Sequence, residues 1–560
     1  MAQSTAHLFL TSLSAAGVRY VFANAGTDFA PIVEAIAAEP GAAFPQFVIC
    51  PHENLAIAMA QGYYLASGEA QAAMVHVNVG VANAICGLLN VARDNVPLIF
   101  LSGRTPVSES GRLGSRDNFI HWGQEMFDQA GMIREIVKWD YELRFPEQAP
   151  IIVARAAAIA NSAPQGPVYL SLPREVLAQD APDGARAVRI AAAGPPAPDP
   201  DAIASAASQI VAARSPLIIT SRAGRTAAGF ASLAEFAENL AIPVVEFAAN
   251  YACLPGDHPM HAGYSPAPLL PSCDLLIMVE APVPFTPHRV RPAPTCRFIE
   301  IGVDPLHEKL PFRGFETDLA IRAETAPALD ALAAAVRSHA SFDAKAIAAR
   351  RERLRPELSS ARSLRIGKAS AAGATITHAY ASSCISKAIG TDAVLVNERG
   401  CLREAMAFTQ SGTFFGPTIA GGLGAAIGVA LGVKLASPQK FVAAALGDGS
   451  FMFNNPLACL QTSAAQKLGI LILVLNNEAW DSVRASTLQV YPAGATASSA
   501  RAPLTYLSPS PDYAAVARAC GADGVSVADP ALLPSVLAQA ATAVKATGRT
   551  FLVDIRVTGG

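Results

Sequence analysis

The stretch from Phe441 to Val483 constrains the fold most, because two apolar runs in it enclose a segment with helix-compatible spacing. The first run ends in Gly447-Asp448-Gly449-Ser450, and the second run, residues 471–475, ends in Asn476-Asn477. Both runs have the length of a strand and lack polar alternation, as expected of strands that are buried on both faces of a sheet. The stretch therefore predicts two parallel strands joined by a helix near residues 456–467.

Asp448 and Asn477 directly follow these two predicted strands. Ligands of open α/β sheets bind beyond the carboxyl ends of parallel strands, so both side chains should lie on the ligand side. A carboxylate and an amide oxygen, with glycines that let backbone N–H groups approach closely, suit Mg²⁺ bridged to phosphate oxygens. A Gly-Asp-Gly sequence alone is more often a tight turn. The Asn pair after the next strand makes the cation site the favoured interpretation.

This spacing resembles the thiamin-diphosphate motif of the superfamily that contains pyruvate decarboxylase, acetohydroxyacid synthase and benzoylformate decarboxylase. The 25 residues between Ser450 and Asn476 make a slightly longer gap than in many members. The resemblance implies thiamin diphosphate and Mg²⁺ as cofactors, with the cation held by Asp448, Asn477 and the backbone carbonyl of Ala479. It also implies contacts with the cofactor from Gly447, Gly449, Ser450 and Trp480.

The chain has 560 residues, of which 51% are hydrophobic, and a formal net charge of −3. Three domains are natural for this length, and alternating strand and helix patterns place all of them in the α/β class. A proline-rich linker at 192–201 and a charged helix at 350–365 divide the chain. We expect three open, doubly wound parallel-sheet domains: a pyrimidine-binding domain at 1–180, a central domain at 190–345, and a diphosphate- and Mg²⁺-binding domain at 365–560.

Charge and hydropathy exclude several kinds of partner. No basic face indicates binding to nucleic acid or to an anionic membrane, so we expect a small-molecule substrate. No apolar run approaches the 18 or more residues of a spanning helix. The first residues carry no basic region before their short apolar part, and the nine cysteines lack metal-site spacing. These features predict a cytoplasmic protein with reduced thiols.

In the first domain, Glu53 stands between a predicted strand at 47–50 and a predicted helix at 55–67. An acidic residue at a helix start commonly complements only the helix dipole. In the superfamily, the glutamate at this position contacts a ring nitrogen of the cofactor. The resemblance therefore implies that Glu53 is both a catalytic residue and a cofactor ligand.

Other residues of the first domain resemble two different members of the superfamily. Asn24-Ala25-Gly26-Thr27 resembles Asn-Pro-Gly-Ser of benzoylformate decarboxylase, which implies that Asn24 contacts the cofactor and Thr27 the substrate carboxylate. His76 falls where that enzyme has an active-site histidine. Gln124 resembles the glutamine of acetohydroxyacid synthases that reaches the thiazolium ring. A buried core histidine and a loop amide in water are the alternatives for His76 and Gln124.

The central domain shows strand candidates at 216–220, 243–247, 275–279 and 297–301. The sequence Ala281-Pro282-Val283 followed by His288 resembles a stretch of benzoylformate decarboxylase that contributes a second active-site histidine, with one extra residue here. A surface histidine among prolines is the alternative for His288. We expect no nucleotide in this domain.

In the third domain, a predicted strand at 394–398 carries Asn397, which matches a superfamily position close to the cofactor. Gly421 and Leu423 belong to a glycine-rich segment, 420–428, that predicts a helix start packed closely on its neighbours. The resemblance implies that Gly421 contacts the cofactor. Leu423 stands 25 positions before Asp448. At this position the superfamily has the large apolar residue that bends the cofactor, so the resemblance assigns that role to Leu423.

The resemblance implies non-oxidative decarboxylation of a 2-oxo acid that is benzoylformate-like, branched or aromatic, with or without carboligation. The alternatives are an acetolactate-synthase-like ligase, a 2-hydroxyacyl-CoA lyase or oxalyl-CoA decarboxylase, and an inactive cofactor-binding regulator. Superfamily members place this glutamate of one subunit opposite the diphosphate site of another. We therefore expect a homodimer or homotetramer with active sites at subunit interfaces.

Overall fold

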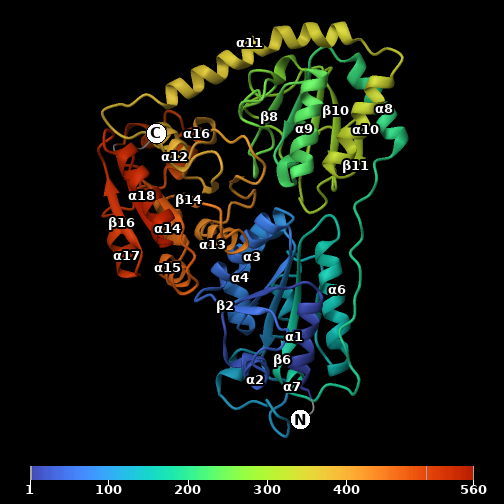
Figure 1. Cartoon of the computed structure of the whole chain (residues 1–560), viewed down its shortest axis with the longest axis vertical. Coiled ribbons are helices and arrows are strands. Elements are labelled where there is room, and N and C mark those ends of the chain that lie inside the picture. Colours follow the sequence, from blue (N-terminus) through green and yellow to red (C-terminus); the bar gives the residue numbers. More distant parts are fainter. Residues whose placement is uncertain (1–2, 500, 559–560) are drawn as a thin grey trace.

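The computed structural model describes residues 3–499 and 501–558. The chain forms three parallel sheets, each covered by helices, in three separate parts of the molecule (Figure 1). This architecture confirms the predicted fold class. The outermost residues of the first and third predicted domains, 1–2 and 559–560, lie outside the described residues.

The N-terminal sheet has the strand order β2-β1-β3-β4-β6-β5. Its strands are β1 (Tyr20–Ala23), β2 (Gln46–Ile49), β3 (Gln71–Val75), β4 (Leu98–Arg104), β5 (Asp140–Glu142) and β6 (Pro167–Pro173). Its helices of nine or more residues are α1 (Thr5–Ala15), α2 (Ala30–Ala38), α3 (Glu53–Ser67), α4 (Val77–Arg93) and α6 (Ala149–Asn161). Strands β3 and β6 are buried along their whole length, which explains their unbroken apolar sequences.

The central sheet has the strand order β11-β10-β9-β7-β8. The four predicted strands are present as β7 (Pro216–Thr220), β8 (Val244–Glu246), β9 (Leu275–Val279) and β10 (Arg297–Gly302). Helices α8 (Pro200–Ala212), α9 (Ala227–Leu240) and α10 (Thr325–Ser338) belong to this domain. The predicted strands do not include the edge strand β11 (Leu319–Arg322), which is only four residues long and buries only Ile321.

The C-terminal sheet has the strand order β13-β12-β14-β15-β17-β16. Its strands are β12 (Val394–Glu398), β13 (Phe414–Phe415), β14 (Val442–Gly447), β15 (Leu471–Asn476), β16 (Asp523–Val527) and β17 (Phe551–Arg556). Strands β14 and β15 are parallel, with Gly447 paired to Leu475, and α15 (Pro456–Ala465) connects them. The predicted strand–helix–strand unit is therefore confirmed, with the short helix α14 (Asp448–Phe453) added after β14.

Two connections join the domains. An extended linker runs along the outside of the N-terminal domain up to α8, and α11 (Ala344–Ala369) bridges the central and C-terminal domains (Figure 1). Helix α11 is longer than the predicted charged helix at 350–365. It begins early because the Asp343 carboxylate accepts hydrogen bonds from the backbone N–H groups of Lys345 and Ala346. No helix in the described part of the chain is both long enough and apolar enough to span a membrane.

The N-terminal and C-terminal domains meet where α3 packs against α13 (Ala426–Ala436). A Cβ atom on Gly62 would lie 1.9 Å from the carbonyl oxygen of Val429, and one on Gly432 would lie 2.1 Å from that of Met59. Only glycine lets the two helix backbones approach this closely. The prediction that 420–428 begins a helix is wrong in its boundary, because Gly421, Gly422 and Gly424 precede α13 in a loop that turns through positive φ at two of them.

Candidate active site

Asp448 lies at the carboxyl end of β14 and begins α14. Its Oδ1 atom accepts a hydrogen bond of 2.8 Å from the backbone N–H of Gly449. Its Oδ2 atom is buried and has no hydrogen-bond partner among the described residues. Burial raises the pKa of Asp448, and nearby backbone N–H groups oppose that effect. A buried carboxylate oxygen without a partner is what a bound cation would satisfy.

Asn477 lies beside Asp448, at the end of the neighbouring strand β15. Its Oδ1 atom accepts a hydrogen bond of 3.1 Å from the backbone N–H of Ala479, and its Nδ2 atom donates to Asp481 at 2.5 Å. An amide oxygen has two lone pairs, so Asn477 can still ligate a cation. A carboxylate, an amide oxygen and a backbone carbonyl fit a hard divalent cation whose remaining ligands are phosphate oxygens of a bound cofactor.

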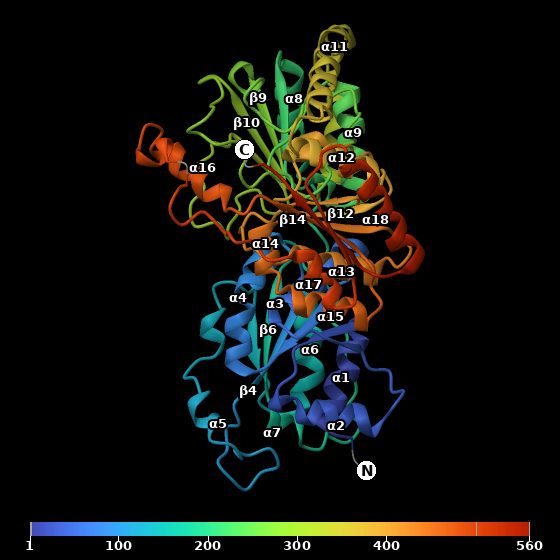
Figure 2. The same ribbon diagram turned by 90° about the vertical axis from the view of Figure 1, so that its left-hand side faces the viewer.

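A cavity of about 340 Å³ opens at this position. Of the predicted residues it is lined by Leu423, Gly447, Asp448, Gly449, Ser450, Asn477, Ala479 and Trp480. A Cβ atom on Gly449 would lie 2.2 Å from the indole nitrogen of Trp480, so glycine lets the indole pack on the backbone. Beyond Trp480, helix α16 (Asp481–Val490) projects from the domain with no buried residue (Figure 2).

Glu398, at the end of β12, organises the wall of this cavity, and the sequence analysis missed it. Its carboxylate accepts hydrogen bonds of 2.7 to 2.8 Å from the backbone N–H groups of Gly424, Ala425 and Ala426. It also accepts one from the hydroxyl group of Ser450. Burial raises the pKa of Glu398, against the effect of these bonds. Glu398 therefore fixes the loop that carries Leu423.

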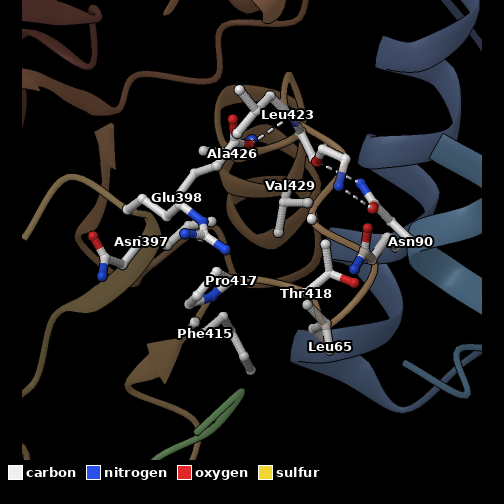
Figure 3. Close-up of a pocket in the computed structure, with 17 residues that line it drawn as sticks. Leu65, Asn90, Asn397, Glu398, Phe415, Pro417, Thr418, Leu423, Ala426 and Val429 are labelled. Carbon is white, nitrogen blue, oxygen red and sulfur yellow. Dashed lines mark hydrogen bonds between the residues drawn. The ribbon is translucent and has the colours of Figure 1, made fainter. Parts of the chain in front are cut away.

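Leu423 also lines a second, smaller pocket, to which Asn397 and Gly421 contribute (Figure 3). Asn90, on α4, donates a hydrogen bond of 2.9 Å to the carbonyl of Gly422 and accepts one of 3.1 Å from its N–H. The Asn397 amide exchanges two hydrogen bonds with the backbone of Cys401, so this side chain closes the turn after β12.

Arg399 follows Glu398 and lines both the cavity and the smaller pocket. It adopts a left-handed backbone conformation, with φ of 58°. The next residue, Gly400, makes this turn possible, since a Cβ atom there would lie 2.4 Å from the backbone nitrogen of Leu446. The turn places a cationic side chain at the ligand side of the sheet.

Glu53 begins α3 and is buried, at 8% exposure. The amide of Asn83 donates a hydrogen bond of 3.3 Å to its Oε2 atom. His52 caps the helix by accepting a hydrogen bond from the backbone N–H of Asn54. Asn24, at the end of the neighbouring strand β1, donates to the carbonyl of Cys50 at 3.2 Å. These contacts hold Glu53 at the carboxyl edge of the N-terminal sheet.

His76 follows β3 at the same edge, directly before α4, and lies against Asp28, a residue that was not among the predicted site residues. The His76 Nδ1 atom is 2.5 Å from Asp28 Oδ1, and this hydrogen bond raises the pKa of His76 against the effect of burial. On the other side of the ring, Nε2 is 3.4 Å from the Gln124 amide. The structure thus brings His76 and Gln124 together, while Thr27, next to Asp28, is exposed.

His288 is exposed in a turn after β9, and it does not line the cavity. The neighbouring Arg289 donates a hydrogen bond of 3.3 Å to Gln489 on α16. The turn therefore lies next to the helix that leads away from the cation site.

Apart from Asn397, Gly421 and His288, the predicted residues fall into two groups within one chain. All lining residues of the cavity at Asp448 lie between positions 378 and 483. Glu53, His76 and Gln124 are not among them. Each chain therefore presents a C-terminal group at β14 and β15 and an N-terminal group at β1 to β3.

Three parallel-sheet domains with an Asp–Asn pair at one strand–helix–strand unit define the class of three-domain thiamin-diphosphate enzymes. The chain belongs to the thiamine pyrophosphate enzyme family: it matches the N-terminal TPP binding domain over residues 3–132, the central domain over 203–332, and the C-terminal TPP binding domain over 399–555. The predicted family is confirmed.

Several curated relatives are similar over most of their length. A probable 2-ketoarginine decarboxylase of Pseudomonas aeruginosa is 30% identical, over 85% of this chain and 81% of its own. Benzoylformate decarboxylase of the same organism is 27% identical, over 84% and 85%. The large subunit of acetolactate synthase isozyme 3 of Escherichia coli is 25% identical, over 99% and 95%.

Solved structures share the fold. A thiamine diphosphate-dependent 4-hydroxybenzoylformate decarboxylase of Rhodococcus jostii has a TM-score of 0.79 at 23% identity, over 100% of this chain and 99% of its own. Benzoylformate decarboxylase of Polynucleobacter necessarius has a TM-score of 0.78 at 21% identity, over 100% and 99%. At these identities the likeness concerns the fold alone.

Proposed function

We propose that this protein is a thiamin-diphosphate-dependent carboxy-lyase that decarboxylates a 2-oxo acid without oxidation. The observation that carries the proposal is the buried, unpartnered Oδ2 atom of Asp448 beside Asn477, at the ends of two adjacent parallel strands. The decarboxylases among the relatives support the reaction type.

Asp448, Asn477 and the carbonyl of Ala479 would hold Mg²⁺ against the diphosphate of the cofactor. The bound cofactor supplies an electron sink that accepts the electrons of the broken carbon–carbon bond. The contribution of this chain is to bind and orient. Glu398 fixes the loop, and Leu423 presents an apolar surface to the cofactor in the cavity it lines.

Proton transfer falls to the residues of the N-terminal group. Glu53 is buried, so its carboxyl group can exchange a proton with a cofactor ring nitrogen without competition from bulk water. His76 can deliver a proton to the substrate carbon that has released CO₂. Thr27, Gln124 and His288 are the further proposed substrate contacts.

The separation of the two groups of residues supports an assembly in which two chains complete each site. We propose a homodimer or a homotetramer built from such dimers, with the N-terminal group of one subunit facing the Asp448 cavity of its partner. We also propose that the protein is cytoplasmic.

The side chain of the substrate stays open between benzoylformate-like, branched and aromatic 2-oxo acids. The acetolactate synthase relatives, and the position of Gln124 beside His76, favour carboligation as the second candidate activity. A lyase that acts on acyl-CoA esters would differ from both in its substrate requirement.

The test is CO₂ release by the purified protein with thiamin diphosphate and Mg²⁺. The substrates are pyruvate, branched-chain 2-oxo acids, benzoylformate and 2-ketoarginine, and Glu53→Gln is the control. We expect release that is lost in Glu53→Gln. Formation of acetolactate from pyruvate would support the ligase instead. No release from any of these acids by the cofactor-loaded protein would overturn the proposal and lead to acyl-CoA substrates.

A further inference from the structure

Asp28 and His76 form a buried pair at the carboxyl edge of the N-terminal sheet. Asp28 is 3% exposed and lies in the one-turn helix η1 (Thr27–Phe29) that follows β1. Its Oδ1 atom is 2.5 Å from Nδ1 of His76, and its Oδ2 atom accepts a hydrogen bond of 3.3 Å from the backbone N–H of Val77. The carboxylate therefore holds both the ring of His76 and the first turn of α4.

Two glycines make room for this pair. A Cβ atom on Gly26 would lie 2.1 Å from His76 Nδ1, and a Cβ atom on Gly103 would lie 1.8 Å from Asp28 Oδ2. Any side chain at either position would push the ring and the carboxylate apart. The backbone is thus shaped around the contact between them.

The charges around His76 favour its protonated form. Asp28 from η1 and Glu53 from α3 both face it, and the hydrogen bond with Asp28 is the largest influence that raises its pKa. The third titratable neighbour is His121, on α5 (Ile120–Gly123), whose own pKa is lowered by burial and by Arg174. His121 therefore stays neutral near neutral pH and adds no opposing charge.

The free side of the His76 ring faces Gln124. His76 Nε2 is 3.4 Å from the amide nitrogen of Gln124, and the Oε1 atom of the same amide is buried without a hydrogen-bond partner among the described residues. An amide nitrogen cannot accept a hydrogen bond, so a protonated Nε2 requires the amide to turn and present Oε1 as the acceptor. Because Asp28 occupies Nδ1, the proton that His76 can give away is the one on Nε2.

We propose that Asp28 is a positioning residue that keeps His76 as an imidazolium with its Nε2–H available to the reacting substrate. The inference rests on the proposed function and deepens it. After the carbon–carbon bond breaks, the substrate carbon that has lost CO₂ takes the Nε2 proton onto its electron pair. His76 is left neutral, with Nδ1–H still bonded to Asp28, and solvent water returns a proton to Nε2.

The first experiment uses the protein without cofactor, so its result does not depend on catalysis. Diethyl pyrocarbonate modifies neutral imidazole, and mass spectrometry of the tryptic peptide 20–93 measures modification of His76 against pH. In the wild type we expect a midpoint above the ordinary imidazole value of about 6.5. In Asp28→Asn the midpoint should fall by about one unit or more, because an adjacent opposite charge shifts a pKa by about 1–3 units.

His52 lies in the same peptide and forms no hydrogen bond or ion pair with a carboxylate of residues 3–499 or 501–558, so its modification profile should be the same in both proteins. A wild-type midpoint for His76 at or below about 6.5 would overturn the proposal even if Asp28→Asn failed to fold. Equal His76 profiles in the two proteins would also overturn it.

The second experiment measures the pH profile of kcat with a decarboxylated 2-oxo acid. The high-pH limb should move to lower pH in Asp28→Asn. Adding Asp28→Asn to His76→Gln should cause no further loss, because Asp28 acts through His76. Losses that multiply in the double variant would overturn the positioning role. A shifted modification profile in a protein that decarboxylates no 2-oxo acid would instead refute the proposed function and leave the pair intact.

Discussion

Replacing Glu398 by alanine should release the loop that carries Leu423. The substitution removes the acceptor of three backbone N–H groups, and two of these bonds, from Gly424 and Ala426, are fully buried. Leaving one buried donor unpaired costs about 1–3 kcal/mol, so two cost about 4 kcal/mol together. In local opening this corresponds to roughly 700-fold faster hydrogen exchange of the loop amides, at about 1.4 kcal/mol for each factor of ten.

The assay is hydrogen exchange followed by mass spectrometry on peptides that cover residues 422–428, with thiamin diphosphate affinity measured in parallel. Glu398→Gln keeps the volume and one accepting oxygen, so its effect should fall between those of Glu398→Ala and the wild type. Glu357→Gln, at an exposed position on α11, is the matched control and should change neither quantity. Exchange in Glu398→Ala within about tenfold of the wild type would refute the reasoning, because it would put the cost below about 1.4 kcal/mol.

Two further substitutions test the domain contacts. Gly432→Ala places a methyl group against a backbone oxygen of α3 and should lower the free energy of urea unfolding by about 3 kcal/mol. Gly367→Ala, on α11 with open space around it, is the control and should raise that free energy by about 0.5–1 kcal/mol. Arg222→Met breaks the buried ion pair of 3.1 Å between Arg222 of the central domain and Asp94 of the N-terminal domain, and should lower the free energy of unfolding by about 3–5 kcal/mol. The double variant Arg222→Met, Asp94→Asn leaves no unpaired buried charge and should recover part of this loss. Equal losses of stability in the single and double variants would contradict a role for the buried charge.

The sequence predicted the parts of the fold that depend on local pattern. The runs before Asp448 and Asn477 are apolar because β14 and β15 are buried on both faces, and that burial leaves a signal in neighbouring residues. Strand β11 leaves only a short apolar run of three residues, because it is four residues long and buries one side chain, Ile321. The glycines before Leu423 were assigned to a helix start because small residues suit close helix packing. In the structure Gly428, within that segment, and Gly432 beyond it perform that packing against α3, and Gly421 and Gly424 turn the loop.

The residues that the sequence analysis missed depend on contacts between distant positions. Glu398 accepts hydrogen bonds from the backbone N–H groups of residues 424–426, and Asp28 is hydrogen-bonded to His76. The role of each acidic residue depends on a partner far away in the sequence, which local spacing cannot reveal. Thr27 was selected by resemblance and Asp28 beside it was not. An acidic residue that follows a glycine turn after a strand was the available signal for Asp28, but it is equally typical of a helix start.

The division of the predicted residues into two groups leads to a test of the proposed assembly. If each site takes its cavity from one chain and Glu53 from the other, a chain with Glu53→Gln and a chain with Asp448→Ala can complement each other. In a mixed dimer, one site carries both changes and the other carries neither. Random pairing makes half of the dimers mixed, so co-expression of the two variants should give about one quarter of the wild-type CO₂ release. Each variant alone should give almost none. A site completed within one chain leaves every site in the mixture with one change, so a co-expressed mixture as inactive as its parents would refute the shared site.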